Sequence, residues 1–127
     1  GIRGQRALLL LSDGRDEGSR FSYEDTLDFA RRAGVAIYTI GLDIPRRDLD
    51  TRRILTRFAD ETGGRAFFVK EASGLAEIYS TIERELRTRY LLAYQSSNPS
   101  RDGRFRTIDV KVAGSGLEVK AMRGYYP

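Results

Sequence analysis

The sequence predicts an α/β fold, in which helices pack on a parallel β-sheet and an antiparallel β-meander follows. Short apolar runs of strand length alternate with amphipathic helical segments over residues 1–89. Such alternation is typical of parallel strands joined by right-handed crossovers. From residue 90 to residue 127, strand-like segments follow one another without helices between them. We therefore expect an α/β part, residues 1–89, and a β-rich extension, residues 90–127, packed on the same domain.

The first strand and the first helix are predicted from local signals. Residues 6–11 form an apolar run that is closed by the turn residues Ser-Asp-Gly at 12–14. A short run stopped in this way is typical of a strand buried on both faces. Ser22 and Asp25 have the spacing of a capping box, which predicts a helix start. Gly34 is well placed to end that helix.

Two more strands and two more helices complete the expected α/β part. A β-branched run predicts a strand over residues 35–40, and a shorter strand is expected over residues 65–69. The helix between them should span residues 48–62. Asp48 and Asp50 could form a carboxylate pair. We favour a capping role, because they lie where this helix needs a cap and Asp is a residue type that caps helices. Ser73 is expected to cap the third helix in the same way.

The third helix and the aromatic residues suggest particular contacts. Glu83–Arg87 and Glu85–Arg89 are i,i+4 pairs in the favourable order along the helix. Aromatic side chains can stack on nucleic-acid bases, but helical and strand spacing places several tyrosines toward the core. We expect three of the seven tyrosines to be core residues: Tyr23, Tyr38 and Tyr79.

The extension is predicted to contain three strands. They cover residues 90–95, 105–112 and 117–122, with a polar loop over 96–103 and a tight turn over 113–116. The turn contains Gly-Ser-Gly, but without a Gly-x-x-x-x-Gly-Lys pattern a hairpin is favoured over a phosphate loop. The pattern leaves open whether these strands extend the parallel sheet or form a small antiparallel appendage.

Composition excludes several kinds of site. The chain has 127 residues, of which 40% are hydrophobic and 31% charged, a balance typical of a soluble globular protein. It contains no histidine and no cysteine, which excludes His-dependent nucleophilic sites and the usual zinc sites. A metal would need oxygen ligands, which favours magnesium, manganese or calcium. No apolar run approaches the ~20 residues that span a membrane, and the first six residues lack a signal-peptide segment.

Charge patterning argues against a nucleic-acid partner. The net charge is +4, and the arginines could contact phosphates. They are scattered, however, and often lie beside acidic residues, as at 15–17 and 83–85. No run of five basic residues occurs, so we expect a solvated surface of mixed charge.

Asp13 is the candidate functional residue. It follows the carboxyl end of a predicted buried strand, where open α/β sheets place their ligand sites. Ser12 and Asp16 lie nearby in the sequence and offer further hard oxygen ligands. The alternative interpretation is that Ser-Asp-Gly forms only a turn, because Asp and Gly both favour turns.

Three blocks of the sequence resemble one protein family when taken together. Residues 6–16 contain an apolar strand and an Asp-Gly turn, and residues 34–41 read Gly-Val-Ala-Ile-Tyr-Thr-Ile-Gly. Residues 58–67 contain a Thr-Gly-Gly segment that precedes the last helix. In this order and spacing the blocks, which cover residues 6–88, resemble von Willebrand factor A-like domains. The resemblance implies the C-terminal half of a Rossmann-like domain, and the tail resembles a bacterial subfamily of exported proteins.

The resemblance also implies a function. Members of this family carry a metal-ion-dependent adhesion site with ligands from an Asp-x-Ser-x-Ser motif, a distant Thr and the Asp of the Asp-Gly turn. Only the last has a counterpart here, Asp13, with Ser12 and Asp16 as weaker candidates. This implies an adhesion-type module that binds a protein ligand and has an incomplete metal site. No cofactor should bind tightly, although Mg²⁺ or Mn²⁺ would suit an intact parent domain.

Two other functions remain open. One is a metal-independent half-domain that serves in assembly. The other is a divalent-metal enzyme acting on a phosphorylated substrate, which we disfavour because His, Cys and a second acidic loop are missing. In the family, further strands flank the strand at residues 7–11, and without them its bare edge would invite pairing. We expect a homo-oligomer through this edge, the alternative being that residues 90–95 fold onto it.

Overall fold

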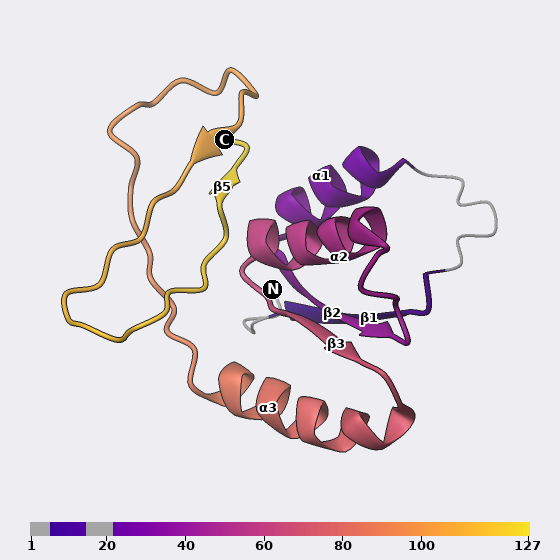
Figure 1. Ribbon diagram of the computed structural model, residues 1–127. Helices are drawn as coiled ribbons and strands as arrows, with labels where there is room; N and C mark the ends of the chain where they lie inside the picture. Colours follow the sequence, from indigo (N-terminus) through magenta and orange to yellow (C-terminus); the bar gives the residue numbers. More distant parts are fainter. Residues whose placement is uncertain (1–5, 15–21) are drawn as a thin grey trace.

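The α/β part is a three-layer arrangement of helices and a parallel sheet (Figure 1). The computed structural model describes residues 6–14 and 22–127. The strands β1 (Arg6–Ser12), β2 (Val35–Leu42) and β3 (Ala66–Val69) are parallel and adjacent in that order. Helices α1 (Tyr23–Ala33) and α2 (Leu49–Thr62) cover one face of the sheet, and α3 (Leu75–Arg87) covers the other. The predicted fold class and strand order are confirmed.

Local capping explains where the first two helices begin and end. Ser22 and Asp25 form the expected capping box, with the Ser22 Oγ–Asp25 Oδ2 distance at 2.7 Å. Gly34 ends α1 in the left-handed region at φ 63°. Asp48 accepts a hydrogen bond from the Thr51 amide and so caps α2 as predicted. The predicted Ser73 cap is wrong, because Ser73 lies inside the 3₁₀ turn η1 (Ala72–Gly74) and α3 begins without a side-chain cap.

The core lies on both faces of β2, because β2 is the central strand. On the α3 face, the buried residues are Ala36, Tyr38, Ile40, Ile78 and Ile82. On the other face they are Leu27, Ala30, Ile37 and Phe58. Tyr38 is 1% exposed, whereas Tyr79 is 44% exposed and is not the core residue we predicted. Tyr79 follows the buried Ile78 and therefore points about 100° away from the stripe that faces the sheet.

Strand β1 is exposed, which corrects the prediction that it is buried on both faces. Its four leucines, Leu8 to Leu11, are 36–52% exposed. The pairing of Leu8 with Ile37 and of Leu9 with Tyr38 places alternate leucines on opposite faces of the sheet. β1 is an edge strand, and within the described residues only β2 pairs with it. Neighbours on one side alone cannot cover both of its faces.

The extension contains much less strand than predicted. Only β4 (Arg106–Thr107) and β5 (Gly124–Tyr125) pair, in an antiparallel two-stranded sheet. The strands predicted at 90–95 and 117–122 are not formed, apart from a single bridge between Met122 and Thr62. An apolar alternation becomes a strand only beside a partner strand, and residues 90–95 have none in the described part of the chain.

Contacts with α1 hold the extension against the α/β part. The Tyr126 hydroxyl donates to Asp28 Oδ1 at 2.9 Å, and the Arg32 guanidinium lies 4.0 Å from the centre of the Tyr126 ring. The Arg31 guanidinium stacks on Phe105 at 4.6 Å. These contacts tie the tail to the helix layer, although the division of the chain at residue 89 stays a prediction.

Of the two ion pairs predicted at the end of α3, one forms and the other does not. Glu83 and Arg87 form the expected ion pair at 2.6 Å. Glu85 instead pairs with Arg65 at 2.7 Å, because Arg89 lies beyond the last helical residue. Arg89 donates to the Tyr38 hydroxyl at 3.0 Å. Burial raises the pKa of Tyr38, and the Arg89 charge opposes that rise.

Candidate functional site

The Asp13 turn lies at the carboxyl edge of the sheet. Ser12, the last residue of β1, is in register with Gly41 of β2, so Asp13 follows the strand end as predicted. The Gly14 amide donates to Ser12 Oγ at 3.1 Å and Gly14 has φ 81°. A Cβ on Gly14 would lie 3.0 Å from Ile44 Cδ1. The turn therefore packs against the loop after β2 and holds Asp13 exposed at this edge.

The described residues at this edge do not form a metal centre. Ser12 is half-buried and its Oγ already accepts a hydrogen bond within the turn. Asp16 lies outside the described residues. In the described part of the chain, no group of three or more His, Cys, Asp or Glu side chains is placed to hold a metal. A single carboxylate does not fit Mg²⁺, which demands near-octahedral ligation, so the roles of Asp13, Ser12 and Asp16 as ligands stay predictions.

Two other acidic residues near this edge have structural roles, Asp48 through its side chain and Asp43 through its backbone. Asp48 caps α2, with Oδ1 3.1 Å from the Thr51 amide. Asp43 has φ 54°, and its amide donates to the Val69 carbonyl at 2.8 Å, which joins the ends of β2 and β3. Among the described residues, Asp13, Asp43 and Asp48 do not form a group of three placed to hold a metal ion.

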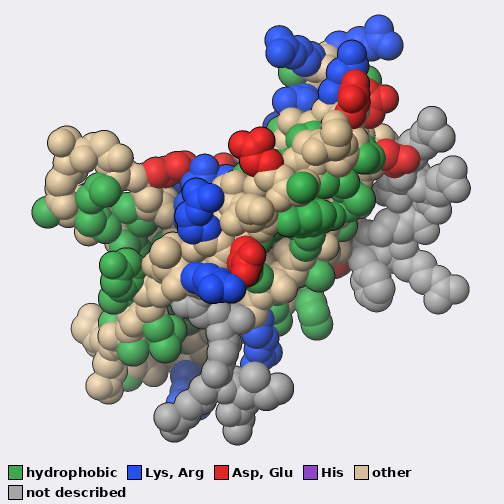
Figure 2. All heavy atoms as spheres, turned by 90° about the horizontal axis from the view of Figure 1, so that it is seen from below, with side chains coloured by type: hydrophobic (Ala, Val, Ile, Leu, Met, Phe, Trp, Pro, Cys, Tyr) green, Lys and Arg blue, Asp and Glu red, His purple; other side chains and the backbone are tan. Residues whose placement is uncertain are grey.

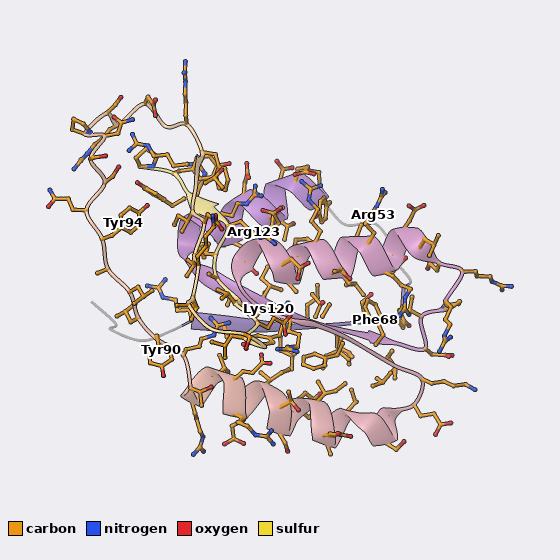
Figure 3. All side chains as sticks on the ribbon, turned by 60° about the vertical axis from the view of Figure 1, so that its left-hand side comes forward. Arg53, Phe68, Tyr90, Tyr94, Lys120 and Arg123 are labelled. Carbon is orange, nitrogen blue, oxygen red and sulfur yellow. The ribbon has the colours of Figure 1, made fainter. Side chains whose placement is uncertain are left out.

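Basic residues surround a hollow at the same edge, and the sequence did not predict it. Arg46 from the loop after β2, Arg52 from the first turns of α2 and Lys70 after β3 all line it, together with Asp43. The guanidinium of Arg52 lies 3.9 Å from the centre of the Phe68 ring. Figure 3 shows Phe68 beneath the N-terminal half of α2. These residues come from three separate segments of the chain, so the sequence does not show that they lie together. The adjacent pair Arg46-Arg47 in the loop is the one local sign of a basic site.

Two exposed apolar segments are further candidate surfaces. The first is the β1 edge described above. Figure 2 shows hydrophobic side chains gathered on part of the face seen from below. The second is the extended segment after α3, where Tyr90 and Tyr94 project from the chain (Figure 3). There Tyr90 is 91% exposed and Leu91 is 87% exposed. Exposed apolar segments of this kind mark interaction surfaces.

The fold and the position of the Asp-Gly turn define the class of protein, an open Rossmann-like α/β domain with its ligand edge at the carboxyl ends of parallel strands. The family description "von Willebrand factor type A domain" matches residues 2–81. The chain therefore belongs to the von Willebrand factor type A family, whose domains are generally protein-interaction modules.

One solved structure gives a more detailed comparison. The chain is similar to an uncharacterized membrane spanning protein from Vibrio fischeri, whose crystal structure is known. The two sequences are 33% identical, and the structures superpose with a TM-score of 0.54. The similarity covers 63% of this chain and 46% of that chain, so the segment spans less than half of that protein. The comparison with curated proteins found no match. Among the described residues, no helix is long and apolar enough to cross a membrane.

Proposed function

We propose that this chain is an adhesion-type interaction module. In it, Asp13 supplies one metal ligand of an incomplete metal site. The observation that carries the proposal is the turn that holds Asp13 beyond the end of β1, at the edge where open α/β sheets bind ligands. The remaining ligands would come from further loops of an intact parent domain, and the bound partner would be a protein. By family resemblance alone, we also place the protein outside the cytoplasm, and we assign it no enzymatic activity.

Metal titration tests the incomplete site. We expect the 127-residue chain to bind Mg²⁺ and Mn²⁺ more weakly than about 0.1 mM, because one carboxylate cannot replace the hydration shell of either ion. Isothermal titration calorimetry on the wild-type chain and on Asp13→Ala measures this directly. A micromolar affinity that disappears in Asp13→Ala would contradict the incomplete site and show that this segment holds the ion by itself.

As the alternative function, we propose metal-independent assembly, in which the chain forms a homo-oligomer through the β1 edge. The supporting observation is the exposure of Leu8 to Leu11 on a strand whose outer edge pairs with no described residue. An edge strand with unpaired amides and carbonyls is a template for another strand. A second copy offers the same strand, and two such edges are self-complementary about a two-fold axis. Pairing would cover both the backbone edge and the adjoining leucines.

Sedimentation velocity tests this assembly. We expect wild-type dimers at tens of micromolar, and at least a roughly tenfold weaker dimer for the double variant Leu9→Lys, Leu11→Lys, because charge on the edge opposes pairing. Leu49→Lys is the matched control, since Leu49 is 71% exposed at the start of α2, away from this edge. A wild-type monomer at these concentrations overturns the proposal. Hydrogen exchange would then show whether residues 90–95 protect the β1 amides.

A further inference from the structure

Arg52 is held in place by contacts that leave much of its guanidinium available. Its Nη1 donates to the Ile44 carbonyl at 3.3 Å, and the group stacks on Phe68 at 3.9 Å. Arg52 is half-buried, so its group is already partly removed from water. A guanidinium has five N–H donors, of which the described residues use one here. A guanidinium that is already held in one orientation loses less conformational entropy on binding a planar carboxylate than a freely moving one.

The cations around Arg52 outnumber Asp43, the acidic residue that lines the same hollow. Arg46 and Lys70 are exposed and line the same hollow. Across the described residues, no carboxylate lies within ion-pair distance of Arg46, Arg52 or Lys70. The next arginines along α2 differ, because Arg53 pairs with Asp50 and Arg57 pairs with Glu24, both at 3.1 Å. With three basic residues and one acidic residue, Asp43, in its lining, the hollow carries an excess of positive charge at the carboxyl edge of the sheet.

The surroundings of Arg52 favour a peptide over a nucleic acid. Single-stranded nucleic acids bind most readily where an exposed aromatic face can stack on the bases. Here the Arg52 guanidinium covers one face of the Phe68 ring, which is itself half-buried. The apolar side chains of Ile44 and Val69 also line the hollow. This combination suits a short acidic peptide segment. Its carboxylates would face the cations, and the aliphatic parts of its side chains would contact the apolar residues.

We propose that this hollow binds an acidic segment of a partner protein, with a carboxylate engaging the Arg52 guanidinium and further carboxylates facing Arg46 and Lys70. The inference rests on the proposed function only in taking the partner to be a protein. It requires neither Asp13 nor a divalent cation, because Arg52 supplies the positive charge that a metal ion would otherwise supply. The hollow and the Asp13 turn are neighbours, since Ile44 contacts the position of a Gly14 Cβ and also lines the hollow.

Fluorescence anisotropy with a labelled oligoglutamate peptide tests the proposal. We expect the 127-residue chain to bind this peptide, and an oligoglutamine peptide of equal length about tenfold more weakly or not at all. Arg52→Ala should weaken binding by about tenfold, and Arg52→Lys by about threefold or more, because an ammonium lacks the planar fork. Arg84→Ala is the matched control: Arg84 is an exposed arginine on α3, across the sheet, and should change affinity less than about twofold.

Several results would overturn this proposal. Equal losses in Arg84→Ala and Arg52→Ala would show general attraction to a basic surface. Tighter binding of oligothymidine, lost in Arg52→Ala, would assign the hollow to nucleic acid.

If Arg52→Ala lowers the melting temperature, the double variant Arg46→Gln, Lys70→Gln replaces it. We expect the same loss of peptide binding from this variant, with no change in the stacking of Arg52 on Phe68. Binding should persist in EDTA and in Asp13→Ala, so failure of the metal site and failure of this hollow give different results.

Discussion

Replacing Gly64 with alanine is expected to destabilise the domain by about 3 kcal/mol or more. A Cβ at this position would overlap the carbonyl oxygen of Ile37, in the central strand β2. A flexible side chain could turn away from the new methyl group, but the backbone of β2 cannot, because β1 and β3 pair with it on both sides. Gly64 therefore allows the chain leaving α2 to pass directly against the sheet.

Urea denaturation followed by circular dichroism measures this effect. Gly34→Ala is the matched control, because Gly34 also follows a helix but a Cβ there meets nothing within 4 Å. Its φ of 63° still disfavours alanine, so we expect a loss of about 1 kcal/mol there. Equal denaturation midpoints for the two variants would show that close packing against Ile37 does not constrain position 64.

Thr62→Val is expected to cost about 2–3 kcal/mol. The Thr62 hydroxyl accepts a hydrogen bond from the Ile37 amide at 2.8 Å and donates to the Phe58 carbonyl at 2.7 Å. Thr62 is 1% exposed, so water does not replace these bonds when the hydroxyl is removed. Valine has nearly the same shape but leaves a buried amide of β2 without a partner, and an unsatisfied buried donor carries the full desolvation penalty.

Thr62→Ser separates the hydrogen bonds from the packing. Serine keeps the hydroxyl and loses one methyl group, so we expect it to cost about 1 kcal/mol, clearly less than valine. Chemical denaturation of the three proteins under the same conditions gives the comparison. A serine variant less stable than the valine variant would show that the methyl contact matters more than the bonds to Ile37 and Phe58.

These two predictions explain a short segment of the sequence in physical terms. Thr62 bonds to the Ile37 amide, Gly63 ends α2 in the left-handed region at φ 78°, and Gly64 passes against the Ile37 carbonyl. Each residue type meets a separate requirement of the turn between α2 and β3. The Thr-Gly-Gly segment that suggested the family therefore has a structural role in this turn.

In the α/β part, the order of the elements and most of their ends followed from the sequence alone. Strand runs, capping side chains and terminating glycines act over a few residues, so Ser22 with Asp25, Asp48 and Gly34 marked helix ends correctly. The parallel arrangement followed as well, because each helix between strands implies a crossover. The position of Asp13 beyond β1 could be predicted for the same reason, since it depends only on where that strand ends.

Only the tertiary structure decided which surfaces are covered and which charges meet. The leucines of β1 read as buried but are exposed, because burial depends on neighbours that lie far away in the sequence. Arg89 bonds to Tyr38 rather than to Glu85, and the stacking of Arg52 on Phe68 joins two elements 16 positions apart. Local patterns carry no information about such pairings, because their energies arise only when packing brings distant segments together.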